Sequence, residues 1–135
     1  PVIVHTPHTQ KPAGTERIVE IIEDEGVTQE RIIIDHNTEN TVDISLRTDC
    51  WIGFTLYPGK VDPETAIDIL DEHGTDKMLF NSAADWDPSD PLAVPKARDE
   101  MIDRGWDREE VRKVIYDNPY EFFNQSPNFE FEYEV

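Results

Sequence analysis

Short apolar runs recur along the chain, and a longer amphipathic segment follows each of them. The runs lie at Val2–Val4, Arg31–Ile34, Cys50–Tyr57 and Lys77–Phe80. Continuous β-branched and aromatic runs of this length are typical of strands that are buried on both faces, as in a parallel sheet. The hydrophobic pattern therefore predicts four buried strands.

The segments between these runs carry apolar residues at helical spacing. Thr15 and Thr38 are placed to cap helices, and Pro63 follows Asp62 where a helix is expected to begin. The predicted helices cover about residues 15–25, 38–46, 62–73, 92–103 and 108–116. Residues 6–14 and 81–91 are expected to be loops, and the chain is expected to end in a polar, aromatic tail.

Alternation of strands and helices predicts an α/β fold with a parallel sheet and right-handed crossovers. The units repeat about every 25 residues, as in a TIM (β/α)8 barrel, which needs roughly 250 residues. Residues 1–135 are thus expected to form a single domain with four βα units, half of such a barrel. Because the chain begins inside a strand and without Met, further sequence is expected upstream. An open doubly wound sheet is the alternative, although no G-x-G-x-x-G motif supports a dinucleotide site.

The charge of the chain narrows the possible partners. There are 30 acidic residues against 12 lysines and arginines, a net charge of -18, and the acids are spread along the whole sequence. Such a surface repels phosphate backbones, so nucleic acid is a poor partner, and it suits a halophilic, high-salt cytosol. A single cysteine, the absence of a signal peptide pattern and the absence of a long apolar run favour a cytoplasmic protein without a membrane span.

Histidines follow the first two predicted strands. His5 ends the first and His36 ends the second, while Asp85 lies beyond the fourth. Reactive groups collect at the carboxyl ends of parallel strands, so two imidazoles and a carboxylate can converge there. This ligand set suits zinc, iron or manganese. Each histidine could instead be a structural residue held by hydrogen bonds, and Asp85 could begin a turn.

Other polar residues at the same edge are candidate substrate contacts. They are His8, Lys11, Asn37, Tyr57, Lys60 and Asn81. His8 could equally be a surface residue, and Lys60, after Pro-Gly, a solvated turn lysine.

Four motifs, "PVIVHTPH", "IIIDHN", "MLFNSAADW" and "DNPYEFF", together resemble the TatD-like metal-dependent hydrolases of the amidohydrolase superfamily. The match runs over nearly the whole chain, from the fifth strand of that barrel to its final helix. The resemblance implies that His5 and His36 are metal ligands, and that Asp85 is both a ligand and the base for the attacking water. Asn81 is the alternative occupant of the last position.

The function implied is hydrolysis of an ester, amide or phosphodiester bond by a metal-activated water. Zinc is the preferred ion, with manganese, iron or magnesium as alternatives, and a small molecule is the preferred substrate. The missing N-terminal half, or a second copy, would complete the barrel. A TatD-type deoxyribonuclease and a non-catalytic half-barrel that acts through dimerisation are the competing hypotheses.

Overall fold

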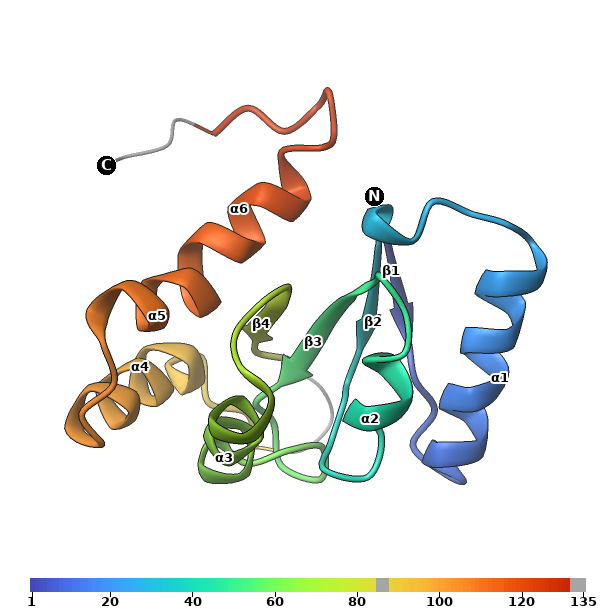
Figure 1. The fold of residues 1–135 in the computed structure, drawn as a ribbon. Helices are drawn as coiled ribbons and strands as arrows, with labels where there is room; N and C mark the ends of the chain where they lie inside the picture. The colour runs from blue at the N-terminus through green and yellow to red at the C-terminus, as the bar shows by residue number, and fades with distance from the viewer. Residues whose placement is uncertain (85–87, 132–135) are drawn as a thin grey trace.

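The computed structural model describes residues 1–84 and 88–131 and contains one parallel sheet. Its strands are β1 (Val2–His5), β2 (Ile32–Asp35), β3 (Trp51–Thr55) and β4 (Met78–Asn81), and they lie side by side in chain order (Figure 1). A doubly wound sheet reverses its strand order at a switch point, whereas a barrel keeps chain order. The prediction of a (β/α)8-barrel type of α/β fold is therefore confirmed.

Helices connect the strands and continue after the last one. They are α1 (Lys11–Asp24), α2 (Val42–Ser45), α3 (Pro63–His73), α4 (Ala93–Asp103), α5 (Arg108–Arg112) and α6 (Asn118–Phe123), with a 3-10 turn at Gln29–Arg31 and a π-helical turn at Lys113–Asp117. None of the helices in residues 1–84 and 88–131 combines the length and the apolarity that a bilayer crossing requires.

The first helix begins earlier than its sequence predicts. It starts at Lys11, and Thr15 lies inside it with its hydroxyl donating to the carbonyl oxygen of Lys11. Pro12 is tolerated because the first helical N–H groups have no partner within the helix. Gly14 allows the preceding loop to pack closely, since a Cβ there would lie 2.2 Å from Cγ of Pro7.

Three other predicted boundaries also differ. The second helix is a single turn that begins at Val42, because Thr38 opens a turn in which its carbonyl accepts from the amide of Thr41. The third strand ends at Thr55, two residues before Tyr57. The last predicted helix, expected to end at Tyr116, continues further: Pro119 falls in the first turn of α6, directly after the π-helical turn, so the helical path continues to Phe123.

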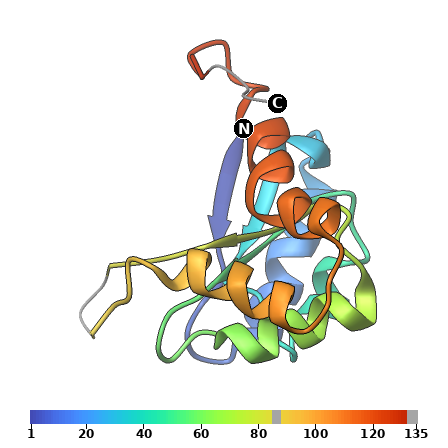
Figure 2. The same ribbon diagram turned by 90° about the vertical axis from the view of Figure 1, so that its left-hand side faces the viewer.

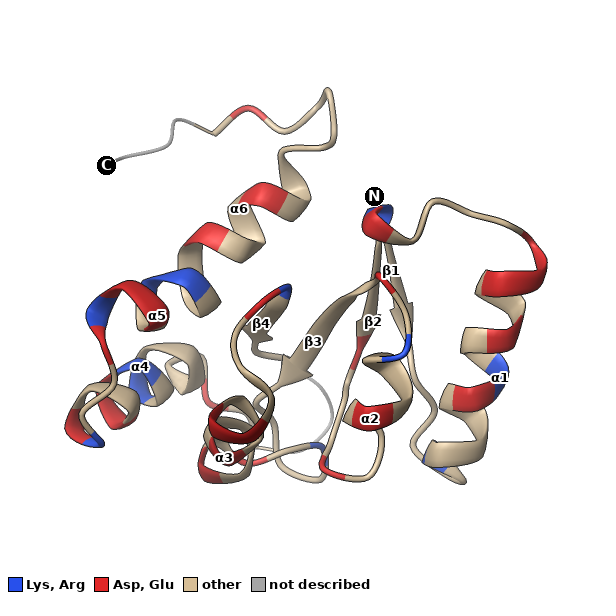
Figure 3. Ribbon diagram, in the orientation of Figure 1, with Lys and Arg blue, Asp and Glu red and all other residues tan. Residues whose placement is uncertain are grey.

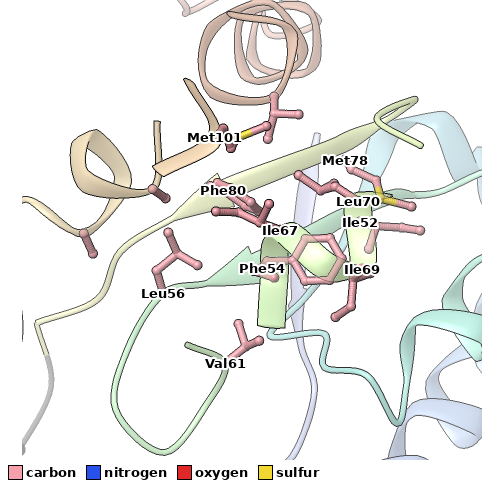
Figure 4. Close-up of a cluster of buried hydrophobic side chains, with 14 of the residues drawn as sticks. Ile52, Phe54, Leu56, Val61, Ile67, Ile69, Leu70, Met78, Phe80 and Met101 are labelled. Atoms are coloured by element: carbon pink, nitrogen blue, oxygen red, sulfur yellow. The ribbon is translucent and has the colours of Figure 1, made fainter. Parts of the chain in front are cut away.

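The two faces of the sheet pack differently because side chains alternate along each strand. On one face, Ile52, Phe54, Met78 and Phe80 pack against residues of α3 and α4 such as Ile67 and Met101 (Figure 4). Ile32 and Ile34 continue this face under α1. These residues form the main core.

The opposite face is apolar only near the amino ends of the strands. There Ile33, Trp51 and Leu79 pack with Phe122 of α6, which lies at this end of the sheet in both views (Figures 1 and 2). Towards the carboxyl ends the same face becomes polar. The register places His5 beside Asp35, and Thr55 beside Asn81.

Candidate metal centre

The imidazoles of His5 and His36 face each other at the carboxyl end of the sheet. His5 is the last residue of β1, and His36 follows β2 with a φ of 64°, in the left-handed region. Nδ1 of His5 and Nε2 of His36 are 2.7 Å apart, and the ring centroids are 4.6 Å apart. Two ring nitrogens in this arrangement can share a proton or bind a common cation.

Asp35 provides a third ligand atom at the same place. The nitrogens of the two histidines and a carboxylate oxygen of Asp35 all lie within 4.8 Å of one another, so they could hold a metal ion. Asp35 is not among the site residues predicted from the sequence. Strand alternation could have identified Asp35 as a site residue, because Asp35 shares the face of Ile33 and pairs in register with His5.

A buried hydrogen-bond network fixes the tautomer of His36. The hydroxyl of Thr55 lies 2.7 Å from Oδ1 of Asn81, to which it donates, and 2.6 Å from Nδ1 of His36. Because the hydroxyl has only one proton, which it donates to Asn81, it accepts a hydrogen bond from Nδ1 of His36. Nδ1 is therefore protonated, and the lone pair on Nε2 faces His5. Partners of this kind commonly orient histidine ligands in metal sites.

The same network positions the Asp35 carboxylate. Nδ2 of Asn81 donates to Oδ1 of Asp35 at 2.9 Å, and Oδ2 lies 3.3 Å from Nδ1 of His36. Gly53 makes room for this carboxylate, since a Cβ at that position would lie 2.4 Å from Oδ1. Residues on four strands therefore hold one carboxylate and two imidazoles together.

His36 is neutral at neutral pH. Burial is the main cause that lowers its pKa to about 4; the charge of Asp35 acts in the opposite direction, while Lys60, His5 and Lys11 lower it further. A neutral imidazole is the form that binds a metal ion. The donor set and its protonation state thus fit a divalent metal.

A cavity of about 550 Å³ opens over these groups. Its wall includes the loop after β1, the ends of β2, β3 and β4, and residues 82–84 after β4. His8 and Asn81 lie in this wall, and the His8 ring stacks over His36 with centroids 6.4 Å apart. Lys60 reaches into it, with Nζ 3.5 Å from Nε2 of His36.

The remaining predicted contacts lie elsewhere. Tyr57 is buried and lines a neighbouring cavity of about 360 Å³, which Lys60 also lines. Lys11 is half-buried at the first turn of α1, and its pKa is lowered by burial and then by the charge of Lys60.

Asn37 has a structural position rather than a place in the cavity wall. Its fully buried amide donates to the carbonyl of Ile34 and accepts from Ser45, and so secures the turn after β2. Asp85, the predicted base, lies outside the described residues.

Comparisons with known proteins find similar metal-dependent hydrolases and TatD-like proteins. The chain matches no protein-family model. It is 28% identical over 124 residues to an uncharacterized metal-dependent hydrolase from Methanocaldococcus jannaschii, covering 91% of this chain and 49% of that protein. Its fold matches the crystal structure of a TatD-like protein from Archaeoglobus fulgidus with a TM-score of 0.70 and 28% identity, covering 92% of this chain and 47% of the other.

The resemblance to TatD-like metal-dependent hydrolases is confirmed. A mutant of an organophosphorus hydrolase from Deinococcus radiodurans shares the fold, with a TM-score of 0.64 at 21% identity over 91% of this chain and 46% of that one. The chain spans about half the length of the proteins it matches.

Proposed function

We propose that this chain supplies one half of the active site of a metal-dependent hydrolase, in which His5 and His36 hold a divalent ion. The observation that carries the proposal is the pair of ring nitrogens, 2.7 Å apart, with an Asp35 carboxylate oxygen within 4.8 Å. When bound, a divalent metal lowers the pKa of water towards about 7 and polarises the scissile oxygen.

The residues of the chain would perform the other tasks. Thr55 and Asn81 keep the lone pair of His36 directed into the site through the bonds described above. Asp35, with its carboxylate beside the two imidazoles, is the proposed third ligand. Asp85 remains the base that the family resemblance suggests, and His8 is a proposed substrate contact.

A small molecule is the proposed substrate and zinc the preferred ion. Two imidazoles and a carboxylate are a common zinc ligand set, although manganese, iron and magnesium use similar donors. The net charge of -18 opposes a polyanion, which makes deoxyribonuclease activity the weaker alternative. We propose a cytoplasmic protein.

Another half is proposed to complete the barrel. The edge strand β1 exposes Val2 and Ile3, and a cavity of about 410 Å³ beside it is lined by apolar residues of β1 and α1. Four further βα units of the same protein would cover this edge, in line with the half-length match. A second copy of the chain is the alternative, which the mass of the native protein in solution would distinguish.

Elemental analysis of the purified protein tests the proposal. We expect a stoichiometric divalent metal in the wild type and its loss, together with hydrolytic activity on a substrate panel, in His5→Ala and His36→Ala. His73→Ala is the matched control, because His73 ends α3 and lies near Asp43 and Glu72 instead of the cavity. A wild-type protein that holds no metal would refute the hydrolase function.

A further inference from the structure

The cavity next to the proposed metal site contains a lysine, Lys60, in an otherwise strongly acidic protein. Only five lysines are present in the chain, and one of them, Lys60, lies in the cavity wall with its ammonium group 3.5 Å from Nε2 of His36. Asp35 is the one carboxylate among the described residues of the wall, and its Oδ1 already accepts from Asn81. Acidic residues occur on every helix from α1 to α6, whereas Lys60 lies in the loop between β3 and α3 (Figure 3).

Local backbone structure fixes the position of Lys60. Pro58 and Gly59 occupy the centre of a turn closed by a 3.0 Å bond from the Lys60 amide to the carbonyl of Tyr57. Gly59 has a φ of 81°, as the third position of a type II turn requires. Nζ of Lys60 lies 5.3 Å from the centroid of the buried Tyr57 ring. The lysine is therefore held in place by the turn and the ring beneath it.

The ammonium group of Lys60 lies where a reacting molecule must pass. Nζ is 3.5 Å from Nε2 of His36, the atom whose lone pair is directed into the proposed metal site. Any group that approaches this nitrogen also approaches the ammonium group. An ammonium group at this place favours a negatively charged partner.

We propose that Lys60 binds an oxyanion of the substrate beside the metal site, so that the substrate is a small molecule with a phosphate or carboxylate group. This inference rests on the proposed hydrolase function and names the substrate class of the same site. Ammonium groups bind phosphates and carboxylates through charge-assisted hydrogen bonds, which are stronger than neutral ones. A small anion reaches the cavity more readily than a polyanion, because the acidic surface of the protein repels every charged unit of the polyanion.

Calorimetric titration of the metal-loaded protein with inorganic phosphate, and separately with acetate, tests the proposal. We expect Lys60→Gln to weaken binding about tenfold or more. Lys60→Arg keeps the charge and should retain affinity within about threefold. Lys77→Gln is the matched control: it makes the same change in net charge at an exposed lysine that bonds to the carbonyl of Asp49, at the other end of the sheet.

Metal content, measured on every sample, separates the two hypotheses. If the wild type holds metal but Lys60→Gln binds both anions as tightly as the wild type, the oxyanion site is refuted while the hydrolase function stands. Equal losses in Lys60→Gln and Lys77→Gln would also refute it, because they would reflect net charge alone. A loss for phosphate only, or for acetate only, would support the site and identify its anion. A wild type without metal would refute the hydrolase function itself.

Discussion

At the scale of single residues, the proposed centre depends on where small and strained positions fall. His36 has a left-handed backbone, which costs a non-glycine residue about 1–2 kcal/mol. Strain of this kind persists where the surrounding structure enforces it, often at functional sites. Here the bonds of His36 to Thr55, and of Asn37 to the turn, hold the conformation. Gly53, which has no side chain, leaves the space that the Asp35 carboxylate occupies.

Gly53→Ala should therefore weaken metal binding as well as folding. The new Cβ would lie 2.4 Å from Oδ1 of Asp35 and 3.1 Å from Cγ2 of Ile33, so the carboxylate must move. Overpacking of this kind costs about 1–3 kcal/mol, measurable by denaturant unfolding, and the displaced carboxylate should lower metal content. Ile52→Val, on the opposite face of β3, should cost about 1 kcal/mol and leave metal content unchanged. Full metal occupancy in Gly53→Ala would argue against Asp35 as a ligand.

At the scale of elements, one face of the sheet has an apolar part, which packs against a helix, and a polar part, which forms the candidate site. The amino ends of β2, β3 and β4 carry Ile33, Trp51 and Leu79, which α6 covers with Phe122. The carboxyl ends of the same strands carry the polar residues. The hydrophobic pattern ended the last predicted helix at Tyr116, because Pro119 interrupts a helical pattern that the structure continues through a π-helical turn. Local sequence rules penalise proline inside a helix, and only the packing of Phe122 shows why the helix continues.

Phe122→Ala should destabilise the protein by about 3–5 kcal/mol, the usual cost of removing a fully buried aromatic ring. The ring packs edge-on against Trp51, with centroids 5.9 Å apart, so its loss leaves a cavity under the sheet. Phe131→Ala is the control, because its side chain is 54% exposed and should cost less than about 1 kcal/mol. Equal unfolding free energies for the two variants would show that α6 does not support the sheet.

At the scale of the whole molecule, self-repulsion among acidic residues sets the conditions for stability. A net charge of -18 destabilises the folded state where charges are unscreened. Helix α1 illustrates the cost, because Glu23, Asp24 and Glu25 lie at its carboxyl end without a basic residue in the last turn. The helix dipole makes acidic residues unfavourable at that end.

Raising NaCl from 0.1 to 1 M should increase the melting temperature by at least about 2 °C, as the screening length falls from about 10 to about 3 Å. The double variant Glu23→Gln and Glu25→Gln should be more stable than the wild type at low salt and should gain less from added salt. Scanning calorimetry in both buffers measures this. A melting temperature that falls with salt in the wild type would exclude a protein adapted to a high-salt cytosol.

The sequence by itself determined the alternation of strands and helices and the location of the two histidines at neighbouring strand ends. Hydrophobic periodicity is local, and parallel pairing necessarily brings carboxyl ends to one edge, so both features follow from the order of residues. Only the tertiary structure decided which side chains meet. Asp35 joins the two imidazoles while Asn37 turns into the protein, because side-chain direction depends on register, strand alternation and the left-handed turn at His36. These are relations between distant segments, which no local pattern specifies.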